Sequence, residues 1–319
     1  MFSSPTVVGD SLIVSSCNGL IRALDKETGE ERWSYDIRKD GDQKEFHGDT
    51  LVTEKLIITT TDGNMGHVYA FDKRSGAVRW KYGVAWRGLA SDVVRSGSNI
   101  YVVTLEDQLV CLDLESGAAR WTFPSSAPPK LYYWTSSPAM LGDRVYFGGL
   151  DGFIYAVEAN SGKLAWKSNL GARISTSIAA QGHDIYLGTA DRHLYRLDAD
   201  SGRVLGELSV ESEPRWRIVS GGDSLLVFLG PQILASVDLS LKQVRWLAKA
   251  SQEWMSARPY LWRDLVLAGG RDELVAFRAS DGARVWSRQI SGTVRGIGVT
   301  DAVLYVGTLK GRVFALAYR

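Results

Sequence analysis

The sequence predicts an all-β fold: an eight-bladed β-propeller of four-stranded antiparallel blades, with three strands in the last blade. A strand–turn–strand unit recurs along the whole chain with a period of 40 to 47 residues. Apolar and polar residues alternate within each unit, which is the period of β-strands. No stretch has the apolar spacing of an amphipathic helix. Four strands in roughly 40 residues are typical of one propeller blade.

The repeated unit is clearest at residues 152–166. One strand runs from Phe153 to Glu158, a turn ends at Gly162, and a second strand carries Trp166. Glycine supplies the positive φ of a tight turn, and the acidic residue accepts hydrogen bonds from turn amides. Tryptophan offers a large flat surface for packing between blades. We therefore predict that six tryptophans are structural: Trp33, Trp80, Trp121, Trp166, Trp246 and Trp286.

In chain order, the repeats predict one propeller domain over residues 1–319. Its blades lie at about 1–37, 46–83, 89–124, 134–168, 174–209, 215–248, 255–289 and 293–319. The fifth copy has Gly206 where tryptophan is expected, and the sixth lacks Ser-Gly between Asp238 and Trp246. The last copy stops before its turn, so either blade eight exposes an edge or the natural chain is longer. Because an unpaired edge favours aggregation, we expect a truncated or excised domain.

Composition argues against several classes of partner. The chain has 319 residues and a net charge of +1, so no overall field attracts nucleic acid or anionic lipid. No apolar run approaches the roughly 20 residues of a membrane helix, and the start has no signal-peptide pattern. We expect a monomer with no nucleic-acid partner and no direct membrane insertion. The location is cytoplasmic for the sequence as it stands, or periplasmic if an upstream export signal has been removed.

The text Leu-Asp-x-x-Thr/Ser-Gly-x-x-x-Trp, preceded by Gly-x-Ile/Val-Tyr-Ala, resembles the pyrroloquinoline-quinone-like (PQQ-like) repeat family. The resemblance covers nearly the whole chain and implies the propeller fold. It does not imply one function, because the family includes quinoprotein dehydrogenases that bind the quinone and calcium. It also includes BamB-type outer-membrane assembly proteins and sensor propellers attached to bacterial kinases, which serve as binding scaffolds.

The chain departs from both better-known branches of this family. It lacks the adjacent cysteine pair that is frequent in the dehydrogenases, and no calcium-ligating set can be placed on it. It also lacks the lipid-attachment cysteine of BamB-type proteins. The resemblance is closer to BamB-type scaffolds and kinase-linked sensors than to true dehydrogenases. We therefore expect no cofactor. PQQ with calcium is expected only if the chain is a small quinoprotein oxidoreductase.

The functional face is predicted from loop lengths. In a propeller, the links between blades and the turns between second and third strands lie on one face, here called the loop face. The turns between third and fourth strands lie on the other, here called the hairpin face. Segments 34–46, 61–66 and 122–134 are longer than their counterparts, and all belong to the loop face. Elaborated loops on a rigid scaffold commonly carry function.

We compared the residue at the start of the innermost strand in each blade. These eight residues should lie together beside the mouth of the central channel. Through the eight blades this slot holds Ser4, Gly48, Asp92, Ser137, Ser177, Arg217, Arg258 and Arg295. Arginine beside aromatic surface suits a carboxylate, a phosphate or a peptide. The predicted ligand- or partner-binding residues are Arg217, Arg258, Arg295, Asp92, Trp216, Trp254, Trp86, Arg87, Trp134 and His47.

A structural alternative stands beside this prediction. The arginines can pair with Asp92, Asp49 or backbone carbonyls and simply close the channel, and the tryptophans outside the repeat slot can belong to the core. The four histidines have no ligand spacing, and no nucleophile–base pair or phosphate loop is present. We predict no catalytic and no metal-binding residue.

Together these patterns favour a non-catalytic protein-interaction or ligand-sensing propeller. It would bind a peptide segment or a small anionic ligand at the channel mouth, with a protein or peptide as the expected partner. Two other functions stay open: a small PQQ-dependent oxidoreductase, and a periplasmic outer-membrane-protein assembly factor.

Overall fold

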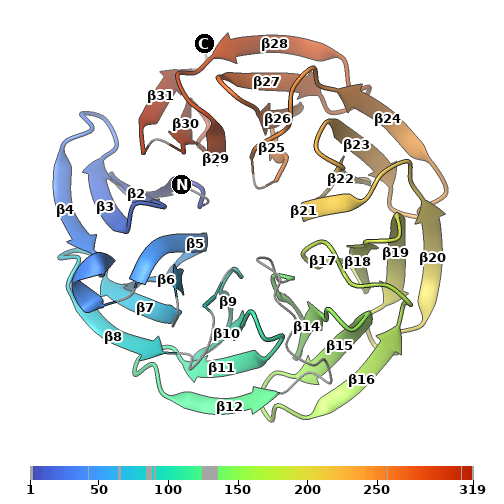
Figure 1. Ribbon diagram of the computed structural model, residues 1–319, viewed down its shortest axis with the longest axis horizontal. Helices are drawn as coiled ribbons and strands as arrows, with labels where there is room; N and C mark the ends of the chain where they lie inside the picture. The colour runs from blue at the N-terminus through green and yellow to red at the C-terminus, as the bar shows by residue number, and fades with distance from the viewer. Residues whose placement is uncertain are drawn as a thin grey trace.

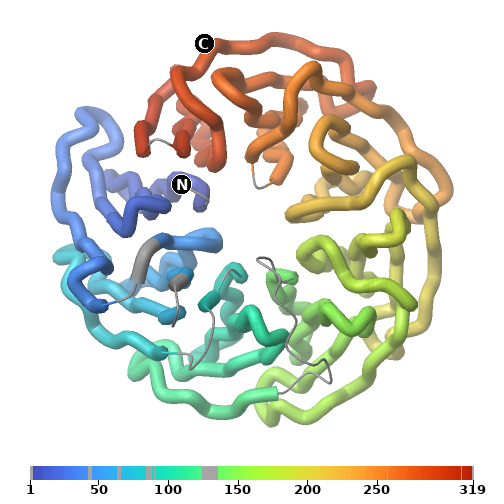
Figure 2. Tube along the Cα trace, viewed as in Figure 1, coloured from blue at the N-terminus to red at the C-terminus, as the bar shows by residue number. Residues whose placement is uncertain are grey.

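Eight antiparallel sheets form a ring of blades in the computed structural model (Figure 1). The model describes residues 3–41, 43–63, 66–83, 88–89, 91–123, 136–256, 258–309 and 311–317. Seven sheets have four strands and the last has three, which confirms the predicted eight-bladed propeller. The chain runs once around the ring, and its blue and red ends meet where β1 contacts β29 (Figure 2).

The strands take four positions from the axis outward. The innermost strands are β1 (Thr6–Val8), β5 (Gln43–Val52), β9 (Val94–Ser96), β13 (Ala139–Leu141), β17 (Ala179–Gln181), β21 (Pro214–Gly221), β25 (Tyr260–Trp262) and β29 (Val294–Val299). The second strands are β2 (Ser11–Ser15), β6 (Leu56–Gly63), β10 (Asn99–Val103), β14 (Arg144–Gly148), β18 (Asp184–Thr189), β22 (Ser224–Leu229), β26 (Leu265–Gly269) and β30 (Val303–Thr308).

The third and fourth strands complete the blades. The third strands are β3 (Leu20–Asp25), β7 (His67–Asp72), β11 (Leu109–Asp113), β15 (Phe153–Glu158), β19 (His193–Asp198), β23 (Ile233–Asp238), β27 (Glu273–Arg278) and β31 (Val313–Ala317). The outer strands are β4 (Glu31–Asp36), β8 (Val78–Gly83), β12 (Ala119–Phe123), β16 (Leu164–Asn169), β20 (Val204–Ser209), β24 (Val244–Lys249) and β28 (Arg284–Gln289). A 3-10 helix, η1 (Ile37–Asp40), follows β4. No helix in the described ranges is long and apolar enough to span a membrane.

The core lies between neighbouring blades. Every residue of β10 and of β26 is buried, because blades on both sides cover the middle strands. Outer strands such as β16 expose most of their residues instead. The hydrophobic clusters accordingly join adjacent blades; one of them unites Ile58 and Val68 of blade two with Ile100 and Val110 of blade three. Burial of this apolar surface holds the ring together.

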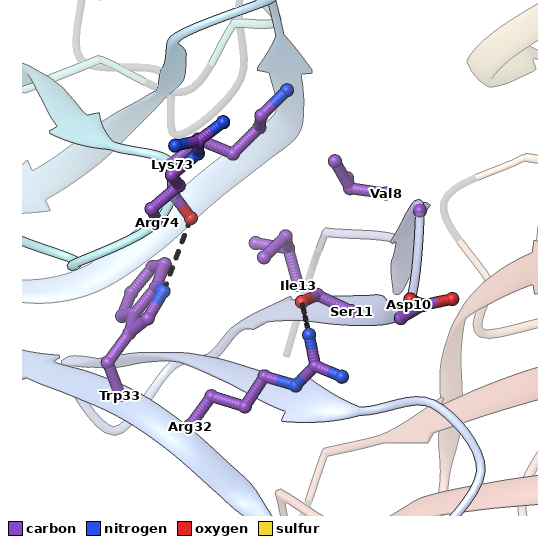
Figure 3. A pocket seen from close by; sticks show the side chains of 9 residues that line it. Val8, Asp10, Ser11, Ile13, Arg32, Trp33, Lys73 and Arg74 are labelled. Atoms are coloured by element: carbon purple, nitrogen blue, oxygen red, sulfur yellow. Dashed lines mark hydrogen bonds between the residues drawn. The ribbon is translucent and has the colours of Figure 1, made fainter.

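Five of the six repeat tryptophans bind the following blade through the indole nitrogen. In Figure 3, Trp33 of blade one donates its Nε1 hydrogen to the carbonyl oxygen of Lys73 in blade two, at 3.3 Å. The same bond recurs from Trp80 to Leu114 at 3.1 Å, Trp121 to Ala159 at 3.2 Å, Trp166 to Ala199 at 2.9 Å and Trp246 to Ala279 at 2.9 Å. Each ring therefore fixes the position of a neighbouring hairpin turn.

The turn glycines are needed for two reasons. Gly162 has a φ of +71°, a conformation that glycine adopts without strain. The tryptophan of the preceding blade also lies directly on it, so that a Cβ at Gly162 would come within 2.7 Å of the Trp121 ring. The corresponding distance is 2.5 Å at Gly117 and 2.6 Å at Gly282, and Gly76 and Gly202 are covered in the same way.

The contact between blades five and six is packed differently. Gly206 takes the tryptophan slot of blade five. In the turn of blade six Lys242 takes the glycine slot, and the residue before it, Leu241, has the positive φ, of 55°. The Leu241 side chain is 3% exposed, and a Cβ at Gly206 would lie 3.6 Å from its Cβ. Leucine thus fills the space that tryptophan fills elsewhere. The missing tryptophan of blade five is therefore compensated by a leucine from the altered turn of blade six.

Candidate functional site

The innermost slots of the first four blades are joined by hydrogen bonds. The amide of Ser4 donates to Asp49 Oδ1 at 2.7 Å, and the amide of Asp49 donates to Asp92 Oδ1 at 2.6 Å. The amide of Asp92 then donates to Ser137 Oγ at 3.1 Å. In blade two the slot therefore belongs to Asp49, which corrects the sequence assignment of Gly48. The cause is a bulge, because the β5–β6 register shifts between His47 and Leu51.

Charged side chains meet across the axis of the ring. Arg217 lies on β21 of blade six, opposite blade two in Figure 1. Its Nη1 donates to Asp49 Oδ2 at 2.6 Å, and its Nη2 donates to Asp92 Oδ1. Arg258 of blade seven adds a third contact, from Nη2 to Asp49 Oδ2 at 3.1 Å. We call Asp49, Asp92, Arg217 and Arg258 the channel cluster.

The channel cluster is held in place by its surroundings. The Arg258 guanidinium lies over the Tyr260 ring, 5.0 Å from its centroid, and the Tyr260 hydroxyl is 2.8 Å from Ser4 Oγ. Exposed fractions are 13% for the Arg217 side chain, 18% for each aspartate and 34% for Arg258. Three of these four charges are thus nearly buried, Arg258 is partly exposed, and the two positive and two negative charges balance one another.

Burial and charge oppose each other at the two aspartates. Burial raises the pKa of Asp49, but Arg217, Arg258 and the Ser4 amide outweigh it and hold the pKa below its usual range. Burial raises the pKa of Asp92, and the nearby Asp49 carboxylate adds to the rise while Arg217 opposes it. Both carboxylates accept hydrogen bonds from Arg217, so they share its positive charge.

The third predicted arginine does not join this cluster. Arg295 Nη1 donates to the carbonyl oxygen of Met255 at 3.0 Å, in the link between blades six and seven. Burial lowers the pKa of Arg295, in contrast to the arginines that face carboxylates. Of the three arginines that the sequence places at the channel mouth, the structure brings Arg217 and Arg258 together.

The predicted aromatic residues take different positions. Trp254 is 4% exposed and stacks on Phe228 with ring centroids 6.3 Å apart, so it packs in the core rather than facing a ligand. Trp216 is half-buried against the same hydrophobic cluster, in a backbone bulge with a φ of 65°. His47 is buried, with Nε2 3.1 Å from Glu45 Oε2. Trp86, Arg87 and Trp134 lie outside the described residues.

A pocket of about 450 Å³ opens on the loop face. It is lined by Gln252, Glu253 and Met255 from the link between β24 and β25, and by Arg271 from the turn between β26 and β27. Sequence reasoning missed it because the link from Trp246 to the slot residue Arg258 has the same length as the link from Trp80 to Asp92, and it is shorter than the two extended links. One residue that the sequence did single out lies next to this pocket: Arg295, which donates to the Met255 carbonyl oxygen.

A second pocket, of about 320 Å³, lies on the hairpin face between blades one and two (Figure 3). Arg32, which lines this pocket, already donates hydrogen bonds to Asp25 Oδ2 at 2.6 Å and to Ser11 Oγ at 3.0 Å. Lys73 donates to the carbonyl oxygen of Thr53 at 3.3 Å. These contacts make it a less suitable ligand site than the pocket on the loop face.

One buried carboxyl group on the loop face is expected to make stability depend on pH. Asp107 is 1% exposed in the turn between β10 and β11, and its Oδ2 accepts the amide of Leu150 in blade four at 2.7 Å. Burial raises the pKa of Asp107 to about 7; the Leu150 amide opposes the rise and Asp151 adds to it. The folded state therefore retains a proton that the unfolded chain releases near pH 4.

Because the pKa is raised on folding, the free energy of unfolding should fall as pH rises from 4 through 7. We expect a loss of about 2 to 3 kcal/mol that Asp107→Asn removes. Asparagine also tolerates the φ of 58° at this position. Urea denaturation of both proteins at pH 4.5, 6 and 8 measures the difference. Parallel pH profiles for the two proteins would contradict the assignment.

No group of three or more His, Cys, Asp and Glu side chains suited to a metal ion occurs within the residues that the structure describes. The channel carboxylates, Asp49 and Asp92, accept hydrogen bonds from guanidinium groups instead. A calcium ion needs six to eight oxygen ligands, and it would have to displace Arg217 to reach these two. The donor set therefore does not fit calcium-bound PQQ.

These features define an eight-bladed propeller of the PQQ-like repeat class, with charged side chains that meet across its axis. Within that class, the chain belongs to the family described as outer membrane protein assembly factor BamB. The sequence model of this family matches residues 2–83, 64–216 and 127–319.

Individual relatives come from two branches of the repeat class. BamB of Yersinia pestis is 25% identical over 170 residues, which cover 52% of this chain and 43% of that protein. Quinohemoprotein alcohol dehydrogenase ADH IIB of Pseudomonas putida is 32% identical over 126 residues, 34% of this chain and 18% of that protein. The matched region is thus less than half the length of either relative.

Among solved structures, BamB from Moraxella catarrhalis superimposes with a TM-score of 0.84 over 99% of this chain and 96% of that one. The two sequences are 18% identical, so the superposition shows a common fold.

Proposed function

We propose that this chain is a non-catalytic scaffold that binds an extended segment of a partner protein on its loop face. The observation that carries the proposal is the channel cluster. Its arginines are neutralised by Asp49 and Asp92, and they reach across the axis, so they offer little to a free anion. Binding energy then has to come from the loop face around the axis.

The loop-face pocket suits a peptide. Glu253 and Arg271 place opposite charges on its rim, Gln252 offers an amide, and Met255 supplies an adaptable apolar surface. Arg258 lies in the same region of the ring and leaves 34% of its side chain exposed over Tyr260. Paired charges and amides can bind the alternating donors and acceptors of an extended backbone, and methionine accommodates varied side chains.

Family membership supports the kind of partner. Its sequence model is described as outer membrane protein assembly factor BamB, and the Yersinia pestis relative carries the same name. We therefore propose that the bound segment belongs to an outer-membrane protein during assembly, and that the chain acts in the periplasm.

Fluorescence anisotropy tests the proposal, with a labelled outer-membrane β-barrel protein diluted from urea as the probe. We expect saturable binding that weakens at least tenfold when Glu253→Lys and Arg271→Glu are combined, because both rim charges are reversed. Lys163→Glu is the matched control, since Lys163 is exposed on the hairpin face. No binding, or an equal loss from the control variant, would reject the loop-face site.

A small quinoprotein oxidoreductase is the second candidate, favoured by the 32% identity to the Pseudomonas putida dehydrogenase. A cofactor that binds only the folded state at a hundred times its Kd adds about 2.7 kcal/mol of stability. Because the channel carboxylates hold arginines, we expect PQQ with calcium to leave the melting temperature unchanged. A saturable rise in melting temperature that depends on both PQQ and calcium would instead establish the quinoprotein.

A further inference from the structure

A serine and a histidine lie opposite each other in the two outermost strands of blade five. Strands β19 and β20 pair with each other (Figure 1), and their register places Ser209 directly across from His193. Ser209 Oγ is 2.9 Å from His193 Nε2. The sequence predicts no nucleophile–base pair, because these two residues are 16 positions apart and only strand pairing brings them together.

The serine–histidine pair is specific to blade five. The same two register positions in the other complete blades hold Leu20 with Asp36, His67 with Gly83, Leu109 with Phe123, Phe153 with Asn169, Ile233 with Lys249 and Glu273 with Gln289. Blade two repeats the histidine but places a glycine opposite it, so the hydroxyl is missing there. The pair is therefore not part of the repeat that builds the blades.

A carboxylate lies on the other side of the imidazole ring. Asp191 Oδ2 is 3.4 Å from His193 Nδ1, which is long for a hydrogen bond, as is common in sites without substrate. The buried Thr189 holds this carboxylate by donating from Oγ1 to Asp191 Oδ1 at 2.6 Å. A proton on Nδ1 is attracted by the carboxylate, whereas a lone pair there would be repelled. The tautomer whose Nε2 accepts from Ser209 is therefore favoured.

A second carboxylate faces the other ring nitrogen. Glu207 Oε1 is 3.6 Å from His193 Nε2 and accepts the Tyr195 hydroxyl at 3.2 Å. When His193 takes the proton of Ser209, the imidazolium therefore lies between two negative charges. The histidine thus has one group that orients its ring and two that stabilise its charged form, which is the arrangement that activates a serine hydroxyl.

The serine hydroxyl is open to solvent. Ser209 is exposed at the end of β20, and the His193 side chain is 26% exposed. Asp191 lies in the turn between β18 and β19, which places the group on the loop face of blade five. The loop-face pocket belongs to blades six and seven, so the two sites are separate.

We propose that Ser209 is an acylation site that reacts with small activated esters and thioesters. Oγ attacks the acyl carbon, and the bond between that carbon and the leaving oxygen or sulfur breaks. The leaving group departs with the bonding electron pair, and the Oγ proton passes to His193 Nε2 and then to water. The product is an O-acyl serine. His193 acts as the base and Asp191 as a positioning residue.

Acetylation by p-nitrophenyl acetate tests the proposal. Mixed in excess with the 319-residue chain at neutral pH, the ester should release a burst of about one equivalent of p-nitrophenolate per chain. Mass spectrometry of the intact chain should then show a single added acetyl group, and peptide mapping should place it on Ser209. Ser209→Ala should abolish the burst.

The neighbouring groups are tested by the rate of acetylation. His193→Gln should slow it at least tenfold, because the base is lost. Asp191→Asn should also slow it, and Asp191→Glu should keep most of the rate because it retains a carboxylate. All of these side chains lie at the surface end of the blade, so the melting temperature should stay unchanged in each variant.

Two matched controls separate this reaction from general surface reactivity. His183→Gln removes an exposed histidine from the turn between β17 and β18, and Ser287→Ala removes an exposed serine from the outer strand of blade seven. Both variants should be acetylated on Ser209 at the rate of the parent chain.

The proposal would be overturned by an equal burst from the parent chain and Ser209→Ala, or by an acetyl group that maps only to lysine or tyrosine side chains. Equal rates for His193→Gln and His183→Gln would also overturn it, because Ser209 would then react without its base. These outcomes do not depend on partner binding at the loop-face pocket, which Ser209→Ala leaves intact.

Discussion

Replacing Asp49 with asparagine is expected to lower the free energy of unfolding by about 3 to 5 kcal/mol. The Asp49 carboxylate accepts Arg217 at 2.6 Å, Arg258 at 3.1 Å and the Ser4 amide at 2.7 Å. Asparagine keeps the size of the side chain and removes its charge. Arg217 then keeps only Asp92, Arg258 loses its carboxylate partner in the cluster, and the Arg217 side chain, 13% exposed, cannot turn to water.

Denaturation in guanidinium chloride measures this loss, with two further variants as controls. Asp223→Asn breaks an exposed pair, Arg245 with Asp223 at 2.7 Å, and should cost no more than about 1 kcal/mol. The double variant Asp49→Leu with Arg217→Met removes one charge of each sign and should recover most of the stability. If Asp49→Asn cost no more than Asp223→Asn, the channel cluster would not be a stabilising contact between opposite blades.

Replacing Trp246 with alanine is expected to cost about 3 to 5 kcal/mol. The side chain is 7% exposed, covers Gly282 in blade seven and donates to the Ala279 carbonyl oxygen at 2.9 Å. Its loss opens a cavity between two blades and leaves that carbonyl without its donor. The adjacent Leu247 is 42% exposed, so Leu247→Ala should change stability by no more than about 0.5 kcal/mol.

The arrangement in blades five and six suggests a second substitution that would restore part of the stability lost when Trp246 is replaced. There, Gly206 takes the place of the tryptophan, and the buried Leu241 side chain from the turn of the next blade lies against it. Gly282→Leu alone should destabilise the protein, because its side chain meets the Trp246 ring. Combined with Trp246→Gly, it should recover part of the loss, which appears as a large coupling free energy in a double-mutant cycle. Additive effects of the two substitutions would contradict direct packing between these positions.

The fold was largely predictable from local patterns. Strand alternation and the acidic and glycine residues of the turn predict the hairpin around Gly162, and its repetition predicts the ring. The pattern also places Trp166 at a blade junction. It does not say which atom the indole binds, because the Ala199 carbonyl lies in the next repeat.

The candidate site was predictable in part. The slot comparison brought Arg217 and Arg258 to the channel mouth, and it named Asp49 and Asp92 among their structural partners. It misplaced the slot of blade two by one residue, because a bulge at Gly48 shifts the register in a way that alternation cannot reveal. It also offered Trp254 as a contact residue, although Phe228 and Phe277 bury it between blades.

The sequence by itself determined the strands, the turns and the number of blades, because each depends on residues within a few positions of one another. Only the tertiary structure decided which charges meet, since Arg217 and Asp49 are 168 positions apart and touch because the ring places blades two and six on opposite sides of one axis.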